Sequence, residues 1–147
     1  MTDINDFGRV SLADKGLCVL ATARADSTIQ ASVINAGVLD HPLTGVAVVG
    51  LVARGGTRKL ENFRRSPRAT IVARSGWEWV AVEGDVDLIG PVDPTPSLDA
   101  DALRLLLRDV FRAAGGQHDD WDEYDRVMAE DRRTAVFITP ARVYSNG

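Results

Sequence analysis

The sequence predicts a mainly β (α+β) fold, an antiparallel barrel with short helices. About six segments have the apolar, β-branched composition or the two-residue alternation of strands. Short turns rich in Gly, Pro, Asp and Ser separate several of them. Helical spacing appears only in short insertions that do not alternate with the strands, which argues against a parallel sheet.

The first third of the chain is predicted to hold one helical segment and three strands. Gly16 ends the first segment, and Asp26-Ser27 forms the turn between the first two strands. Apolar and polar residues alternate along the second strand, as expected when one face is buried. The predicted bounds are 4–12 for the helix or coil and 17–24, 29–36 and 46–53 for the strands.

A basic helix is predicted over residues 57–65, where Ser66-Pro67 ends it. Residues 68–74 and 77–89 then read as the two strands of a hairpin with a Gly-containing turn. Gly84, inside the second of these strands, is predicted to mark a β-bulge.

Two helices and a last strand are predicted after a proline-rich link. Ser97 is the expected N-cap of the first helix, and Asp120 with Glu123 resembles a capping box at the start of the second. The last strand is expected over 134–139, ending at Pro140. The residues expected to be buried by their helical spacing are Leu103, Leu106, Leu107, Val110 and Phe111 on the first helix and Trp121, Tyr124 and Met128 on the second.

Bulk composition bounds the class of protein. With 147 residues, 45% apolar and 26% charged, the chain is expected to form one globular domain, residues 1–147. It has no apolar run of membrane-spanning length and begins without a signal-peptide pattern, so a cytoplasmic protein with no membrane partner is expected. The single cysteine, Cys18, excludes an internal disulfide and agrees with a reducing compartment. The net charge of −4 argues against a nucleic-acid partner.

The most informative local feature is a basic stretch from residue 54 to residue 68. It holds six of the seventeen Lys and Arg residues, with Glu61 as its only acid. A Gly-Gly turn and Thr57, a good N-cap residue, lead into a helix whose first turn carries Arg58 and Lys59. Cations at a helix N-terminus oppose the positive end of the helix dipole. A bound anion is the simplest compensation, because the free N–H groups there already favour negative charge.

This basic stretch has three interpretations. In the first it is a solvated face whose charges complement the acidic residues between 119 and 131. In the second it contacts nucleic-acid phosphates. Phe63 is the only stacking residue in the stretch, which makes the nucleic-acid interpretation weak. In the third interpretation the Gly-Gly turn approaches an anionic small molecule, Thr57 donates from its hydroxyl, and Arg58 and Lys59 neutralise a phosphate or carboxylate. On the residues alone the third is only slightly ahead of the first.

Catalytic side chains are few. His41 and His118 have no ligand-spaced partners, so no metal site is expected. Cys18 has no obvious base, and no nucleophile motif is present. An anion site without an acid, base or nucleophile is typical of an enzyme whose chemistry comes from a cofactor. Trp77 and Trp79 alternate along one strand face and indicate either core or dimer-interface packing, or an aromatic wall beside a planar ring.

Ordered motifs along the chain resemble a known superfamily, the pyridoxamine 5′-phosphate oxidase-like split-barrel (flavin/deazaflavin oxidoreductase) proteins. The branch they resemble most is the actinobacterial one that depends on the deazaflavin coenzyme F420. Each motif alone is moderately specific, whereas the ordered set covers nearly the whole chain. The segments are 30–37 (QASVINAG), 54–68 (RGGTRKLENFRRSPR), 76–84 (GWEWVAVEG) and 115–133.

The resemblance implies a six-stranded antiparallel split β-barrel of the FMN-binding type, with short helices, that forms a homodimer with a cofactor in each groove between subunits. It implies an F420-dependent oxidoreductase that transfers a hydride between the deazaflavin and an electron-poor small-molecule acceptor. Two alternatives stay open: an FMN-dependent split-barrel oxidoreductase, and a non-catalytic deazaflavin-binding protein.

The resemblance also implies which residues bind the cofactor, and it implies no catalytic side chain. Along the ring and its side chain would lie Ser32, Val33 and Asn35, with backbone contacts from Leu51 and Val52. The phosphate and the start of the anionic tail would be held by Arg54, Thr57, Arg58 and Lys59, with Asn62 beside them. Trp77 would approach the ring from the hairpin, from its own or the partner subunit.

Overall fold

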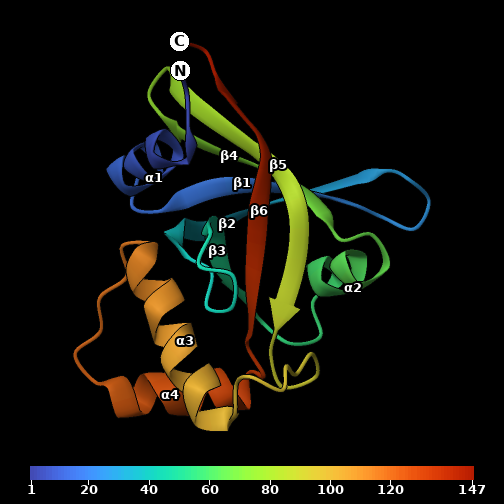
Figure 1. Ribbon diagram of the computed structural model, residues 1–147, viewed down its shortest axis with the longest axis vertical. Coiled ribbons are helices and arrows are strands. Elements are labelled where there is room, and N and C mark those ends of the chain that lie inside the picture. Colours follow the sequence, from blue (N-terminus) through green and yellow to red (C-terminus); the bar gives the residue numbers. More distant parts are fainter.

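The computed structural model describes residues 1–147 and contains six strands and four helices. The strands form a closed barrel in the order β1-β2-β3-β6-β5-β4, and every neighbouring pair is antiparallel (Figure 1). The predicted six-stranded antiparallel barrel is therefore confirmed. The strands are β1 (Leu17–Ala23), β2 (Ile29–Asp40), β3 (Ala47–Ala53), β4 (Arg68–Ser75), β5 (Glu78–Ile89) and β6 (Thr134–Ser145).

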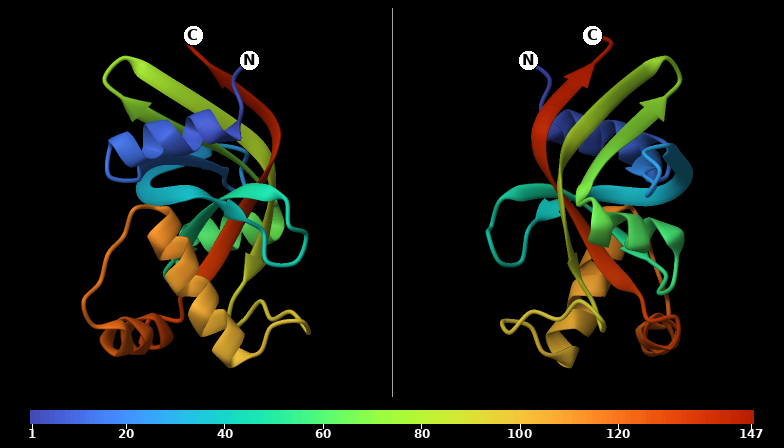
Figure 2. Two further views of the ribbon diagram at one scale, coloured as in Figure 1. Left: turned by 60° about the vertical axis from the view of Figure 1, so that its left-hand side comes forward. Right: turned by 90° about the vertical axis from the view of Figure 1, so that its right-hand side faces the viewer.

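The helices lie outside the barrel in three places. Helix α1 (Ile4–Ala13) covers the end that carries the chain termini and the β4–β5 turn, whereas α3 (Ala100–Ala113) and α4 (Trp121–Glu130) lie together at the opposite end (Figures 1 and 2). Helix α2 (Arg58–Arg65) lies on the side of the barrel, next to β1. None of the four is both long and apolar enough to cross a membrane.

Alternation along the strands builds the core inside the barrel. Val80, Val82 and Val86 of β5 face inward, and Phe7 of α1 is fully buried against this cluster. A second, smaller cluster forms outside the barrel, where Val110 and its neighbours on α3 pack on the outer face of β3 and β6. Helix α3 is thus attached by its predicted apolar stripe, which places its second half beside β2 and β3.

Strand β6 is longer than predicted. It runs through Pro140 to Ser145, because the proline coincides with a shift of register against β5, where it needs to donate no ladder hydrogen bond. The predicted bulge at Gly84 is confirmed: a Cβ there would lie 1.8 Å from the carbonyl oxygen of Thr139. Glycine and proline therefore meet at one bulge, and the predicted strand end at Pro140 is wrong.

The helix caps differ in part from the prediction. Helix α3 begins two residues later than Ser97 implies, and Asp99 is its N-cap, accepting from the backbone N–H of Ala102 at 2.8 Å. Asp120 caps α4 as predicted, accepting from the N–H of Glu123 at 3.1 Å. The second bond of the predicted capping box is absent, since the Asp120 N–H donates to Nδ1 of His118 at 3.0 Å. A carboxylate is the better acceptor at a helix N-terminus because it also complements the dipole.

Candidate functional site

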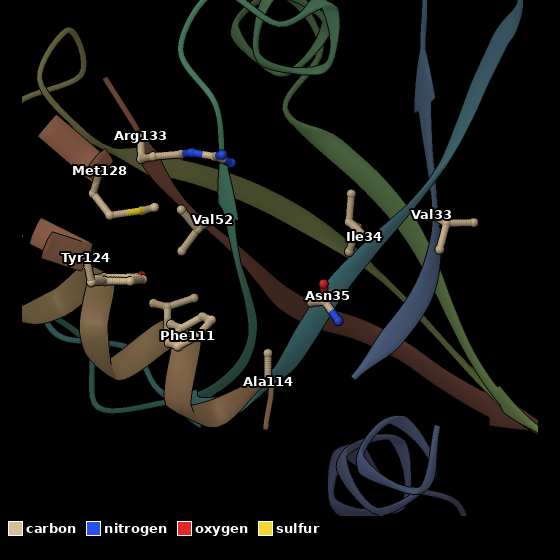
Figure 3. Close-up of a pocket in the computed structure, with 10 residues that line it drawn as sticks. Val33, Ile34, Asn35, Val52, Phe111, Ala114, Tyr124, Met128 and Arg133 are labelled. Atoms are coloured by element: carbon tan, nitrogen blue, oxygen red, sulfur yellow. The ribbon is translucent and has the colours of Figure 1, made fainter. Parts of the chain in front are cut away.

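A cavity of about 370 Å³ lies between the barrel and the two C-terminal helices (Figure 3). We call it the sheet–helix cavity. Its walls are mainly apolar, and its volume lies in the range of small-molecule and cofactor sites. The residues that line it are Val33, Ile34 and Asn35 of β2, Val52 of β3, Val110 and Phe111 of α3, Ala114 just after α3, Tyr124 and Met128 of α4, and Arg133.

The cavity stays open because α4 is attached to α3 rather than to the barrel. Asp125 of α4 accepts hydrogen bonds from Arg108 at 2.5 and 2.9 Å and from Arg104 at 3.1 Å. The Tyr124 hydroxyl donates to the carbonyl of Leu107 at 3.0 Å. Burial raises the pKa of Tyr124 to about 12, so this phenol stays protonated at neutral pH. The Tyr124 ring forms a wall of the cavity, while its hydroxyl proton is engaged in the hydrogen bond to Leu107.

The basic turn between β3 and α2 packs closely against the turn between α4 and β6. The N–H of Gly55 donates to the carbonyl of Asp131 at 3.0 Å, and a Cβ on Gly55 would lie 2.7 Å from the carbonyl oxygen of Arg132. Gly56 has φ +78°, a conformation that L side chains rarely adopt. Both glycines are therefore required for the turn to bring Arg54 and the start of α2 next to Arg133.

Helix α2 is the one helix without a side-chain cap. Thr57 occupies the N-cap position, but its hydroxyl donates to the carbonyl of Arg54 at 2.9 Å and accepts from no N–H of the helix. Without a ligand this hydroxyl thus donates within the turn, and its contact with an anion stays a prediction. The N–H groups of the first turn of α2 are left for another acceptor.

Two cations at this uncapped end have no acidic partner. No carboxylate lies within 4.0 Å of Arg58 or Lys59, whereas Arg54 pairs with Asp131 at 3.9 Å, the same distance as Arg68 from Asp85. Partial burial lowers the pKa of Lys59, and the charge of Arg133 lowers that pKa further. The mutual repulsion of Lys59 and Arg133 favours a bound anion. Arg133 also lines the sheet–helix cavity, so this one arginine lies close both to the basic turn and to the cavity.

The rest of the basic stretch has structural partners. Arg64 is bound to Asp93 at 2.5 Å, and Arg68 lies 3.9 Å from Asp85. Arg65 donates to the carbonyl of Ala23 at 2.8 Å. The interpretation as a paired, solvated face is therefore right for this half of the stretch, although the acids lie on β5 and in the loop after it rather than between residues 119 and 131.

The structure divides the predicted cofactor residues into groups. Val33, Asn35 and Val52 line the sheet–helix cavity, while Ser32 is half-buried and lines no part of it. Leu51 is fully buried in the barrel core, so only its backbone could contact a ligand. The second group lies at the basic turn and consists of Arg54, Thr57, Arg58 and Lys59.

Two predicted residues lie elsewhere. The Asn62 amide is buried and donates to Thr22 and Gln30, both at 3.0 Å, so it ties α2 to the barrel instead of facing the basic turn. Trp77 is 93% exposed at the β4–β5 turn, at the opposite end of the barrel from α3 and α4 (Figure 2). It does not reach the sheet–helix cavity of its own chain.

The sequence assigned other cavity residues to the core. Phe111, Tyr124 and Met128 were predicted as buried by helical spacing, and the same spacing places them on the cavity wall because α4 is held away from β2. Arg133 was not singled out as a binding residue. The only feature of the sequence that could have indicated a binding role for Arg133 is its position between a capped helix and an apolar strand.

Comparison with known proteins confirms the fold. No family model matches the sequence. Rv2991, a conserved hypothetical protein from Mycobacterium tuberculosis, superposes with a TM-score of 0.70 at 19% identity, covering 99% of this chain and 84% of that one. A pyridoxamine 5′-phosphate oxidase-related, FMN-binding protein from Nostoc punctiforme gives 0.63 at 15% identity, covering 99% and 86%.

An F420 reductase gives a TM-score of 0.59 at 15% identity, covering 87% of this chain and 88% of that one. The chain therefore has the split β-barrel fold of pyridoxamine 5′-phosphate oxidase-like proteins. At these sequence identities the similarity establishes the fold alone, and the activity has to be inferred from the residues of the site.

Proposed function

We propose that the protein is an F420-dependent oxidoreductase that transfers a hydride between the deazaflavin and an electron-poor small molecule. The observation that carries the proposal is an apolar cavity of about 370 Å³ whose Arg133 lies close to an uncapped helix end bearing two unpaired cations. A cofactor that consists of a planar ring and an anionic tail matches this arrangement, with the ring in the apolar cavity and the tail at the cations. Fold neighbours named as an F420 reductase and an FMN-binding protein support the same class.

The residues present fit such a cofactor. The N–H groups at the start of α2, with Arg58 and Lys59, would hold the phosphate, and Arg54 and Arg133 would face further carboxylates of the tail. Val52 and Phe111 would exclude water from the ring. The deazaflavin, when bound, supplies the hydride chemistry at C5. This chain then contributes positioning and anion binding.

No side chain of the cavity is placed as an acid. Tyr124 already donates its proton to Leu107, and its pKa of about 12 disfavours ionisation. Asn35 donates to the carbonyl of Lys15 at 3.0 Å. A proton that the product requires would therefore come from solvent.

A homodimer is part of the proposal, because an outward apolar row crosses five strands. Val19 pairs with Val33 on one side and with Val72 on the other, and the row continues through β5 to Tyr144. Val33 is 65% exposed and Val19 45%. A second copy covering this face would bury the row and could bring its exposed Trp77 toward the sheet–helix cavity.

FMN is the second candidate, because its phosphate would fit the same uncapped helix end. A fluorescence titration of the purified protein with F420 and with FMN decides between them. Tighter binding of F420, followed by oxidation of reduced F420 with a panel of enones and quinones, supports the proposal. Preferential binding of FMN contradicts it, and F420 binding without turnover across the panel would indicate a deazaflavin-binding protein.

A further inference from the structure

Helix α2 is fixed to the barrel by two apolar side chains and one buried amide. Leu60 and Phe63 belong to the barrel core and are 0% and 1% exposed. Asn62 is 3% exposed, and none of the other residues of α2 is fully buried. Leu60 and Phe63 are three residues apart and form a single stripe, whereas Asn62 lies about 100° from Phe63 around the helix axis. The amide therefore contacts the barrel away from the apolar stripe.

The Asn62 amide uses both of its N–H groups and its oxygen. The Nδ2 atom donates to Oγ1 of Thr22 on β1 and to Oε1 of Gln30 on β2, both at 3.0 Å. The Oδ1 atom accepts from Arg65 at 2.9 Å, and Arg65 also donates to the carbonyl of Ala23 at 2.8 Å. A buried polar network that is satisfied in this way specifies one arrangement of its members. Asn62 thus ties α2 to the β1–β2 hairpin in one orientation.

Stability alone does not require an amide at this position. The net contribution of a hydrogen bond to stability is small, and replacing both partners by apolar groups of the same shape can be nearly neutral. Apolar contacts are also non-directional, so the single stripe of Leu60 and Phe63 permits the helix to rotate about its axis. The hydrogen bonds of Asn62 resist this rotation. What the amide adds to the apolar contacts is therefore a fixed orientation.

The start of α2 is the part of the molecule that depends on this orientation. Its first turn has no side-chain cap, and Arg58 and Lys59 have no carboxylate within 4.0 Å. Burial and the charge of Arg133 lower the pKa of Lys59, so these two cations repel each other. The repulsion favours a movement of the start of α2 away from Arg133. Asn62, one turn further along the helix, opposes that movement through its bonds to the barrel.

We propose that Asn62 is the positioning residue of the anion site. Its hydrogen bonds to the β1–β2 hairpin set the orientation of α2 at which the free N–H groups, Arg58 and Lys59 converge on one phosphate. The inference rests on the proposed function and deepens it: Asn62 touches no ligand and acts through the helix that carries the ligand contacts. Its role thus differs from that of a contact residue beside the phosphate.

The test compares each candidate cofactor with its counterpart that lacks the phosphate. These pairs are F420 with the same deazaflavin ending at its sugar-alcohol side chain, and FMN with riboflavin. The ratio of the two affinities, from fluorescence titration, measures the contribution of the anionic part alone. Asn62→Leu removes the amide with a side chain of similar size, and Thr22→Val removes one of its partners. Phe63→Leu is the matched control, because it weakens the packing of the same helix and leaves the network in place.

The native protein should bind the phosphorylated form at least about a hundredfold more tightly than its counterpart. Asn62→Leu should reduce this ratio about tenfold and Thr22→Val about threefold, with affinity for the counterpart unchanged in both. Phe63→Leu should lower Tm and keep the native ratio, since a merely structural loss does not act on the phosphate selectively.

An unchanged ratio in Asn62→Leu, or an equal fall in Phe63→Leu, would overturn the positioning role and leave the proposed function intact. If Asn62→Leu does not fold, the ratio in Thr22→Val decides in the same way. A ratio near one in the native protein would overturn the anion site together with the role of Asn62. Preference for FMN over F420 would contradict the proposed cofactor only, and a fall of the FMN-to-riboflavin ratio in Asn62→Leu would still support the positioning role.

Discussion

The two ends of helix α2 carry the same kind of side chain in different surroundings. At its C-terminal end Arg64 is paired with Asp93, and at its N-terminal end Arg58 and Lys59 have no carboxylate within 4.0 Å. The ion pair of Arg64 helps to hold α2 in place. Arg58 and Lys59 instead lie at an uncapped helix end, close to the like-charged Arg133. A charge run in a sequence thus has no single role: its function depends on which members the fold leaves unpaired.

The largest expected effect is on cofactor affinity. Arg58→Ala combined with Lys59→Ala should weaken F420 binding by at least about a hundredfold, because two charge-assisted contacts of about 1.5–3 kcal/mol each are lost. The fold should persist, since neither side chain has a partner within the chain. Fluorescence titration with circular dichroism checks both statements, and an unchanged affinity would remove these two residues from the proposed site.

The opposite end of the helix should behave in the opposite way. Arg64→Ala should leave F420 affinity unchanged and lower the free energy of unfolding by about 1 kcal/mol, because its pair with Asp93 is partly exposed. Urea denaturation measures the loss. A drop in affinity comparable with that of the double variant would show that the two ends are not distinct.

A smaller effect is expected from the acid that lies at the basic turn. Asp131 lies 3.2 Å from Arg133 and 3.9 Å from Arg54. Asp131→Asn keeps the shape of the side chain and the backbone contact with Gly55, while both arginines lose a competing carboxylate. Anion affinity should rise about threefold, a gain that salt screens. Titration of both proteins with inorganic phosphate at low and at high salt measures this gain. Weaker phosphate binding by Asp131→Asn than by the native protein at low salt would contradict the prediction.

The smallest effect concerns the pH dependence of stability. Burial and Arg133 lower the pKa of Lys59 in the fold below its ordinary value of 10.5, so folding disfavours the charged lysine. Lys59→Met should therefore raise Tm slightly at pH 7, by the equivalent of less than about 1 kcal/mol. The gain should shrink as pH rises through the lowered pKa and disappear above 10.5, where Lys59 is neutral in the folded and the unfolded protein alike. A gain that persists at pH 11 would mean that packing, not charge, causes it.

Much of the barrel was predictable because strand signals are local. Two-residue alternation and the Gly-containing turns are set by neighbours in the chain, and the structure confirms them. Gly84 was a local signal of a bulge, although the close approach of Thr139 is what requires glycine there. The continuation of β6 beyond Pro140 was not predictable, because the proline is tolerated only through its pairing with Gly84, 56 residues earlier in the chain. The cap at Asp99 was missed because Ser97 offered an equally good local signal.

The candidate site shows the same division. By itself, the sequence determined the Gly-Gly turn, the cations at the start of α2 and the apolar faces of α3 and α4. Only the tertiary structure decided that Arg58 and Lys59 are unpaired, that Asn62 is buried, that Trp77 lies at the far end, and that Phe111 and Tyr124 line a cavity. The physical reason is that periodicity and capping act within a few residues, whereas charge pairing and cavity formation depend on which distant segments the fold brings together.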